Sequence, residues 1–197
     1  SAGDVVTVLS KTDKYPFNYT LPYSLNIGDE IRVQDIISSR FYFGATNAVW
    51  MTKEALNFAK TPDWIKLATI SGMSQSMAIS KDGDNLWVGT SSGNLYRISN
   101  LNAVRDSAND DVTSPYSIVE TKSISIPNSS GRAITSIAID PQNPEHVIVT
   151  LGNYKNNVYI YRSINALDSL PTWTSKQGNL PKMPIYSAII EMNNPNT

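Results

Sequence analysis

Short runs of β-branched and aromatic residues, separated by turns that contain Gly, Asn, Asp or Pro, recur along most of the chain. This pattern is typical of strands. It predicts strands at residues 4–10, 31–37, 41–45, 48–52, 63–69, 76–80, 85–90, 93–99, 116–126, 133–140, 146–151, 157–163, 172–176 and 185–192. Two stretches, 53–58 and 100–105, could form helical turns but are too short to be stable alone. We therefore expect an all-β fold of antiparallel meanders.

A degenerate unit appears three times, beginning at Phe41, Leu86 and Val147. The copies read FYFGATNAVWMTKEALNF, LWVGTSSGNLYRISNLNAV and VIVTLGNYKNNVYIYRSINALDS. Each copy has an apolar strand, a polar turn and a second strand rich in aromatic residues. The copies begin about 45 and about 60 residues apart, which is the range of β-propeller blades.

Grouping the strands in fours predicts blades at about 31–70, 75–126 and 133–178, with the first strand of a fourth at 186–192. Residues 1–30 would then supply an outer strand and an extended segment, and residues 193–197 a truncated end. A propeller closes with typically four to eight blades, and closure protects its sheet edges. We therefore expect a fragment of a larger ring, whose remaining blades lie in a second chain or in further sequence. An open meander or a distorted sandwich is the alternative.

Composition narrows the partners and the compartment. The chain has 16 Lys and Arg against 17 Asp and Glu, a net charge of −1. Nucleic acids and anionic membranes need clustered Lys and Arg, so neither is expected as a partner. No apolar run approaches the roughly 18 residues of a membrane helix. The absence of cysteine excludes disulfides and thiolate metal sites here, and the charged fraction of 17% favours an exported all-β protein.

The third unit resembles the exported β-propellers with Asp-box or BNR-like repeats, which include sialidase-like, sortilin-like and xyloglucanase-like domains. ITSIAIDPQNPEHVIVTLG looks like the strand, Asp-Pro turn and strand between their blades, and VYIYRSINALDSLPTWTSKQGNLPKMPIYSAIIEM like the sequence that follows. Separately, DGDNLWVGTSSGNLYRI is similar to repeats of sensor-protein propellers. The match departs at the box itself, where Ser163 and Asp168 precede Thr172-Trp173 with extra residues and no Gly. The resemblance implies an exported or cell-surface propeller of bacterial type.

Two carboxylates are candidate catalytic residues. Asp35 and Asp140 fall near the ends of predicted inner strands, and the xyloglucanase-like relatives carry catalytic Asp residues on loops of the central cleft. Glycoside hydrolysis uses a pair of carboxylates across such a cleft. The alternative is structural, because Asp140 precedes Pro141 at a turn-initiating position and Asp35 could cap a loop.

Aromatic and arginine residues follow the repeat. Trp64 and Trp173 both open a last strand, so we expect them to pack between blades. Trp50 is less constrained and is the candidate for stacking on a ligand. Arg97 and Arg162 occupy the same position of the repeat, which argues against the convergent arginine triad of a sialidase.

A metal site is not expected. His146 is the only histidine, and it is expected to be an ordinary surface residue. Oxygen-rich loops at 82–84 and 109–111 leave calcium as the one possible cofactor, although neither has the spacing of a dedicated calcium loop.

The sequence therefore predicts a non-catalytic propeller module of an exported or cell-surface protein, with a surface that binds protein or glycan or acts as a scaffold. One alternative is part of a glycoside hydrolase with a carboxylate pair in the central cleft. Another is the sensing propeller of a signalling receptor.

Overall fold

The computed structural model describes residues 5–8, 17–20, 40–56, 61–104 and 119–191, and the chain divides into two compact units, Ser1–Ser39 and Arg40–Thr197. The described part of the smaller unit is an antiparallel pair of strands, β1 (Val5–Val8) and β2 (Phe17–Thr20). The first of these was predicted and the second was not. The predicted strand at 31–37 lies outside the described residues, and the predicted domain limits stay predictions.

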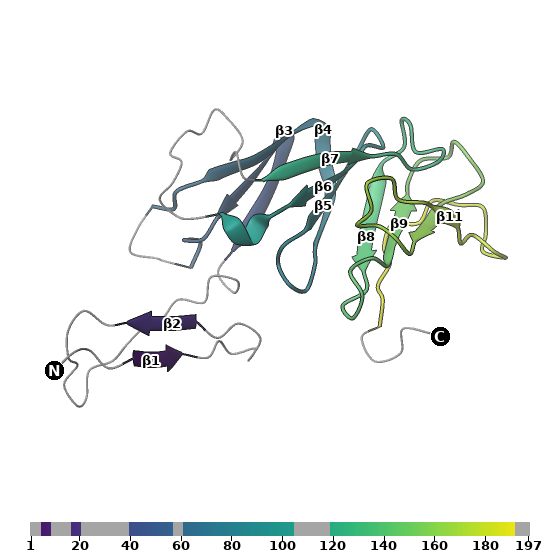
Figure 1. Ribbon diagram of the computed structural model, residues 1–197. Helices are drawn as coiled ribbons and strands as arrows, with labels where there is room; N and C mark the ends of the chain where they lie inside the picture. The colour runs from purple at the N-terminus through teal and green to yellow at the C-terminus, as the bar shows by residue number, and fades with distance from the viewer. Residues whose placement is uncertain (1–4, 9–16, 21–39, 57–60, 105–118, 192–197) are drawn as a thin grey trace. The chain divides into compact units, whose positions relative to one another are not determined.

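The larger unit contains two antiparallel sheets (Figure 1). The first has the order β3 (Phe41–Thr52), β4 (Ile65–Ile79), β5 (Leu86–Thr90), β6 (Leu95–Ser99) and β7 (Glu120–Ile124). The second comprises β8 (Ile134–Ile139), β9 (Val147–Leu151), β10 (Ile160–Ser163) and β11 (Thr174–Ser175), adjacent in chain order. The helical turn expected at 100–105 is the 3₁₀ helix η1 (Leu101–Ala103), whereas residues 53–56 form no helix. The chain is thus all-β, as predicted.

The two sheets stack face to face through β5, which is buried along its whole length. Trp87 points away from its neighbours Leu86 and Val88, as alternation along a strand requires. It joins a core cluster with side chains of the second sheet, among them Ile137, Val149 and Tyr161. Consecutive antiparallel meanders that bury a shared core between their faces are the building plan of propeller blades.

The inner strands of the two sheets approach closely because residue 89 is a glycine. A Cβ atom added to Gly89 would lie 2.4 Å from Cγ2 of Ile134 on β8. Beside this contact, Ser76 Oγ on β4 donates a hydrogen bond of 2.7 Å to the carbonyl oxygen of Ile134. The two sheets therefore meet along β4, β5 and β8.

The other face of the first sheet is covered by parts of β3 and β4, because both of these long strands bend. Asn47 on β3 and Gly72 on β4 have positive φ angles of 62° and 101°, and the Gly72 N–H donates to Asn47 Oδ1 over 3.1 Å. The β3–β4 register shifts at the same place, between Thr46 and Ala48. Beyond the bend, apolar side chains of both strands join the core cluster of β5, β6 and η1: Val49, Met51, Leu67, Ile70, Leu86, Val88, Ile98 and Leu101. The first sheet is therefore packed on both faces.

This bend corrects the expected strand limits in the first unit. The sequence predicted a turn between 41–45 and 48–52 and a break between 63–69 and 76–80. In the structure each pair is one continuous strand, because a bulge absorbs the change of direction without ending the ladder. Residues 48–52 and 65–70 still form a two-stranded layer, packed on β5, β6 and η1, where the first blade was expected.

The predicted strand at 186–192 is not observed within its described part, residues 186–191. Thr135 Oγ1 donates to the carbonyl oxygen of Ile185, and the N–H of Ala188 donates to Ser136 Oγ over 3.3 Å. The segment thus follows β8 through hydroxyl groups instead of a backbone ladder. Among the described residues, no helix is long and apolar enough to cross a membrane.

Candidate functional site

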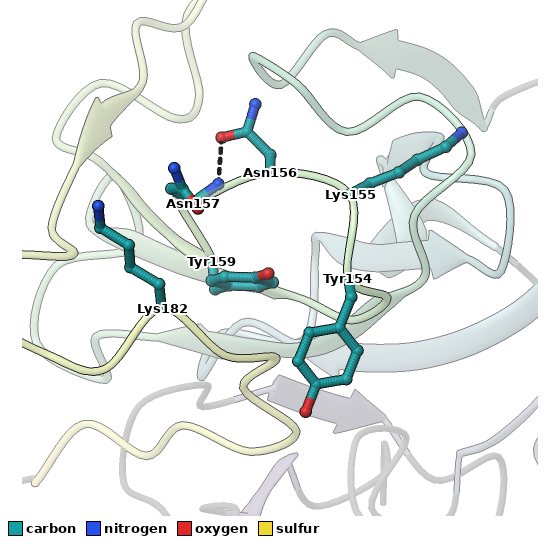
Figure 2. A pocket seen from close by; sticks show the side chains of 6 residues that line it. All are labelled: Tyr154, Lys155, Asn156, Asn157, Tyr159 and Lys182. Atoms are coloured by element: carbon teal, nitrogen blue, oxygen red, sulfur yellow. Dashed lines mark hydrogen bonds between the residues drawn. The ribbon is translucent and has the colours of Figure 1, made fainter.

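The connection between β9 and β10 borders a hollow of about 460 Å³. Its lining side chains are Tyr154, Lys155, Asn156, Asn157, Tyr159 and Lys182 (Figure 2). Five of them come from the β9–β10 turn and the sixth from the segment after β11. The hollow is open to solvent, and its lining is mainly polar.

A buried arginine fixes the turn that carries the first wall. Arg132 is 1% exposed, and its Nε donates to the carbonyl oxygen of Gly152 over 3.2 Å. Its Nη1 donates to the carbonyl oxygen of Val158 over 2.9 Å. Because Gly152 and Val158 stand near the two ends of the turn, these bonds set its width. The guanidinium also lies 4.6 Å from the centre of the Tyr159 ring, a cation–π contact.

Burial lowers the pKa of Arg132, because a low-dielectric surrounding disfavours the charged form. Its Nη2 is buried without a hydrogen-bond partner in the described part of the chain. Holding such a group in place costs stability.

A buried glutamine fixes the second wall. Gln177 Oε1 accepts a hydrogen bond of 2.9 Å from the N–H of Tyr159. Its Nε2 donates to the carbonyl oxygens of Leu180 and Pro181, over 3.2 and 2.9 Å. The residue after Pro181 is Lys182, so one side chain ties both walls of the hollow together.

The lining is cationic and rich in hydrogen-bond donors. Within the described residues, neither Lys155 nor Lys182 has an ion-pair or hydrogen-bond partner for its ammonium group, and the hollow contains no Asp, Glu or His. Tyr154 is 78% exposed, so its ring is accessible to a ligand. Asn156 Oδ1 accepts from the N–H groups of Asn157 and Val158, at 2.6 and 3.2 Å. The arrangement can hold an anionic or hydroxylated ligand but offers no carboxylate for acid–base catalysis.

The predicted catalytic candidates lie elsewhere. Asp35 is outside the described residues, so the separation of the expected pair stays untested. Asp140 follows β8 and is buried, where its Oδ1 accepts from the N–H of Gln142 over 2.8 Å and its Oδ2 lies 3.3 Å from His146 Nδ1. The hydrogen bond from Gln142, followed by that from His146, holds the pKa of Asp140 below its usual value. These contacts stabilise the β8–β9 turn.

The tryptophans also lie outside the lining of the hollow. Trp50 is half-buried on β3 opposite Lys66. Trp173 packs against the core between the sheets, as expected. The expectation for Trp64 is wrong, because its side chain is 38% exposed and meets Phe41 and Phe43 edge-on, with ring centres 6.1 and 6.3 Å apart.

The carboxylates of the oxygen-rich turn at 82–84 accept hydrogen bonds from nearby protein groups. Asp82 Oδ1 accepts from Ser80 Oγ and from the N–H of Asp84, and Asp84 Oδ1 accepts from the N–H of Asn102. No group of three or more His, Asp or Glu side chains suited to a metal occurs among the described residues. The second predicted loop, 109–111, lies outside them, and calcium binding stays a prediction.

Sequence reasoning missed the residues of the hollow, although one signal was present. The β5–β6 connection runs over residues 91–94, whereas the β9–β10 connection at the same place in the repeat runs over residues 152–159. A turn of twice the length with an exposed tyrosine marks a loop with a role beyond joining two strands.

Comparison with known proteins adds little to this geometry. No protein-family model matches the chain, and no curated protein matches it. Among solved structures, it is similar to the β-propeller domain of Cps50 (Swd1) from Myceliophteria thermophila, with 12% identity, a TM-score of 0.41, and coverage of 87% of this chain and 53% of that one. The chain thus spans about half the length of that domain. The stacked antiparallel meanders described above carry its assignment to the β-propeller architecture.

Proposed function

We propose that this chain is a non-catalytic binding module of a β-propeller, and that the hollow at the β9–β10 turn receives the ligand, a glycan or a protein segment. One observation carries the proposal: two buried polar side chains, Arg132 and Gln177, fix opposite walls of an open cationic hollow. Pre-organised walls reduce the entropy that a binding site loses when it orders around its ligand. An exposed aromatic ring, Tyr154, stands at this site without a protein partner.

Binding fits the lining better than hydrolysis does. A glycoside hydrolase needs two carboxylates about 5–9.5 Å apart, and no carboxylate lines the hollow. The carboxylate of Asp140 is occupied by hydrogen bonds from its own turn. Its pKa is lowered, whereas a general acid needs a raised one.

We also propose that the module belongs to an exported or cell-surface protein of the Asp-box type. The resemblance of residues 134–152 to the inter-blade segment of those propellers supports this, as does the low charged fraction of 17%. Fractionation of cells that produce the native protein tests it: recovery of the protein in the cytoplasm alone would contradict export.

A binding screen by NMR tests the proposed module directly. The full 197-residue chain, labelled with ¹⁵N, is titrated with neutral and acidic oligosaccharides and with acidic and basic peptides. We expect one ligand class to shift the amide signals of residues 152–159 and 180–183. Tyr154→Ala should weaken binding about tenfold, the order of magnitude for losing one aromatic contact. Tyr186, another exposed tyrosine at 70%, provides the matched control, and Tyr186→Ala should bind like the wild type.

Two results would contradict the proposal. The first is that no member of the screen binds, or that binding survives Tyr154→Ala unchanged. The second is release of reducing sugar from a polysaccharide by the wild type but not by Asp140→Asn, because this would make the chain a hydrolase.

A further inference from the structure

We propose that the hollow recognises a pyranose that carries an anionic substituent, either a carboxylate or a sulfate. The inference rests on the proposed binding function and deepens it. It follows from three features of the hollow: its uncompensated positive charge, its exposed ring, and the way in which the turn uses its own backbone groups.

The charge of the hollow is local. The whole chain has a net charge of −1, yet Lys155 and Lys182 both line this hollow and no acidic side chain accompanies them. They come from different segments, and Figure 2 shows them on opposite sides of Tyr159. Charges of one sign around a depression focus the field and raise the local concentration of ions of the opposite sign. The ligand is therefore expected to be an anion.

Lysine, rather than arginine, supplies both charges at the rim. An ammonium group is a compact charge on a flexible stem, and it does not demand the planar two-oxygen geometry that a guanidinium prefers. Lys155 and Lys182 are both exposed, so their ammonium groups can move toward a ligand. This chemistry accepts carboxylate and sulfate alike.

The backbone of the turn offers few free donors for main-chain recognition. A bound peptide commonly gains affinity by pairing its backbone with an exposed edge. Here four N–H groups of the turn are already used: that of Lys155 by the carbonyl oxygen of Asn153, those of Asn157 and Val158 by Asn156 Oδ1, and that of Tyr159 by Gln177 Oε1.

The groups that remain for a ligand belong to side chains. They are the exposed ring of Tyr154 and the side-chain amide of Asn157, in addition to the two ammonium groups. An aromatic face packs against the apolar C–H face of a pyranose, while amide and phenol groups bond to its hydroxyls. These groups match an acidic sugar better than an acidic peptide.

Isothermal titration calorimetry of the full chain tests the inference with four ligands: trigalacturonic acid, a sulfated disaccharide, a neutral galactose trisaccharide and tetraglutamate. We expect both anionic sugars to bind at least tenfold more tightly than the neutral sugar and tetraglutamate. Lys155→Gln and Lys182→Gln should each weaken binding of the anionic sugars about tenfold, the loss of one charged hydrogen bond. Lys155→Arg should retain most of the affinity.

Lys81 provides the matched control, because it is an exposed lysine in the β4–β5 turn, outside the hollow. Lys81→Gln should bind like the wild type, and unchanged thermal unfolding of the lysine variants would establish that they remain folded. Equal affinity for the neutral trisaccharide would overturn the inference and leave the binding function standing, whereas tighter binding of tetraglutamate would overturn the choice of a sugar. If none of the four ligands binds, the inference fails, and the NMR screen decides the binding function separately.

Discussion

Replacing Gly89 by alanine probes the contact that joins the two sheets. The added Cβ would lie 2.4 Å from Cγ2 of Ile134, 2.6 Å from its Cβ and 2.7 Å from Ser76 Oγ. Apolar atoms in proteins pack at about 3.5–4.0 Å. The neighbouring strand would therefore have to retreat by about 1 Å.

The structure places the cost at the upper end of the range for overpacking. Extra methyl groups in a packed core cost about 1–3 kcal/mol. Here β8 cannot retreat freely, because Ser76 Oγ holds the carbonyl oxygen of Ile134. We expect Gly89→Ala to lower the free energy of unfolding by about 3 kcal/mol.

Urea unfolding followed by tryptophan fluorescence measures this change, and Trp87 in the core between the sheets supplies a suitable signal. A double-mutant cycle adds specificity. Ile134→Ala alone should cost about 2–5 kcal/mol as a cavity, but in the Gly89→Ala background it also removes the nearest clashing atom. The double variant should therefore be more stable than the sum of the single effects predicts, by about 1 kcal/mol. Additive effects, or an unchanged midpoint for Gly89→Ala, would refute the described contact between the sheets.

Arg132→Met should lower stability by about 3 kcal/mol, because the carbonyls of Gly152 and Val158 lose a charged donor. Hydrogen exchange should quicken across residues 152–159, and Arg132→Lys should not restore protection, since a lysine cannot reach both carbonyls with one planar group. For Asp140, the folded-state pKa lies below that of the unfolded chain, chiefly because of the Gln142 hydrogen bond. Its carboxylate therefore adds stability that is present above the unfolded pKa, about 3.9, and is lost as the pH falls through the folded pKa. In urea unfolding from pH 6 to 3, the stability difference between wild type and Asp140→Asn should narrow toward the acid end, and a constant difference would contradict this.

The strand pattern could be read from the sequence because most strands follow simple alternation. The apolar LWVGT and VIVTL runs are strands β5 and β9. The turn that follows each of them contains the Gly and Asn residues from which a turn was predicted. The exceptions are Asn47 and Gly72. Both are residues that normally end a strand, but their cross-strand hydrogen bond turns them into a paired bend within continuous strands. Such a pairing depends on residues 25 positions apart and has no local signature.

The site was harder to predict than the fold. The polar turn of the third repeat unit was recognised, yet the hollow also depends on Arg132, which precedes β8, and on Gln177 and Lys182, which both follow β11. Their convergence is set by the pairing of β8 with β9 and of β11 with β10, which brings the flanking segments next to the β9–β10 turn. The carboxylates and tryptophans singled out from the sequence are chemically more conspicuous. In the structure, however, Asp140 accepts hydrogen bonds within the β8–β9 turn, and Trp173 packs against the core between the sheets.

A crystal structure of the full chain with bound trigalacturonic acid tests the central claim most directly. The predicted complex has one sugar ring against Tyr154 and a carboxylate within hydrogen-bonding distance of Lys155 or Lys182, with the turn unchanged in shape. A sugar bound at another surface, such as the exposed rings of Phe41 and Trp64, would contradict the assignment of the hollow as the ligand site.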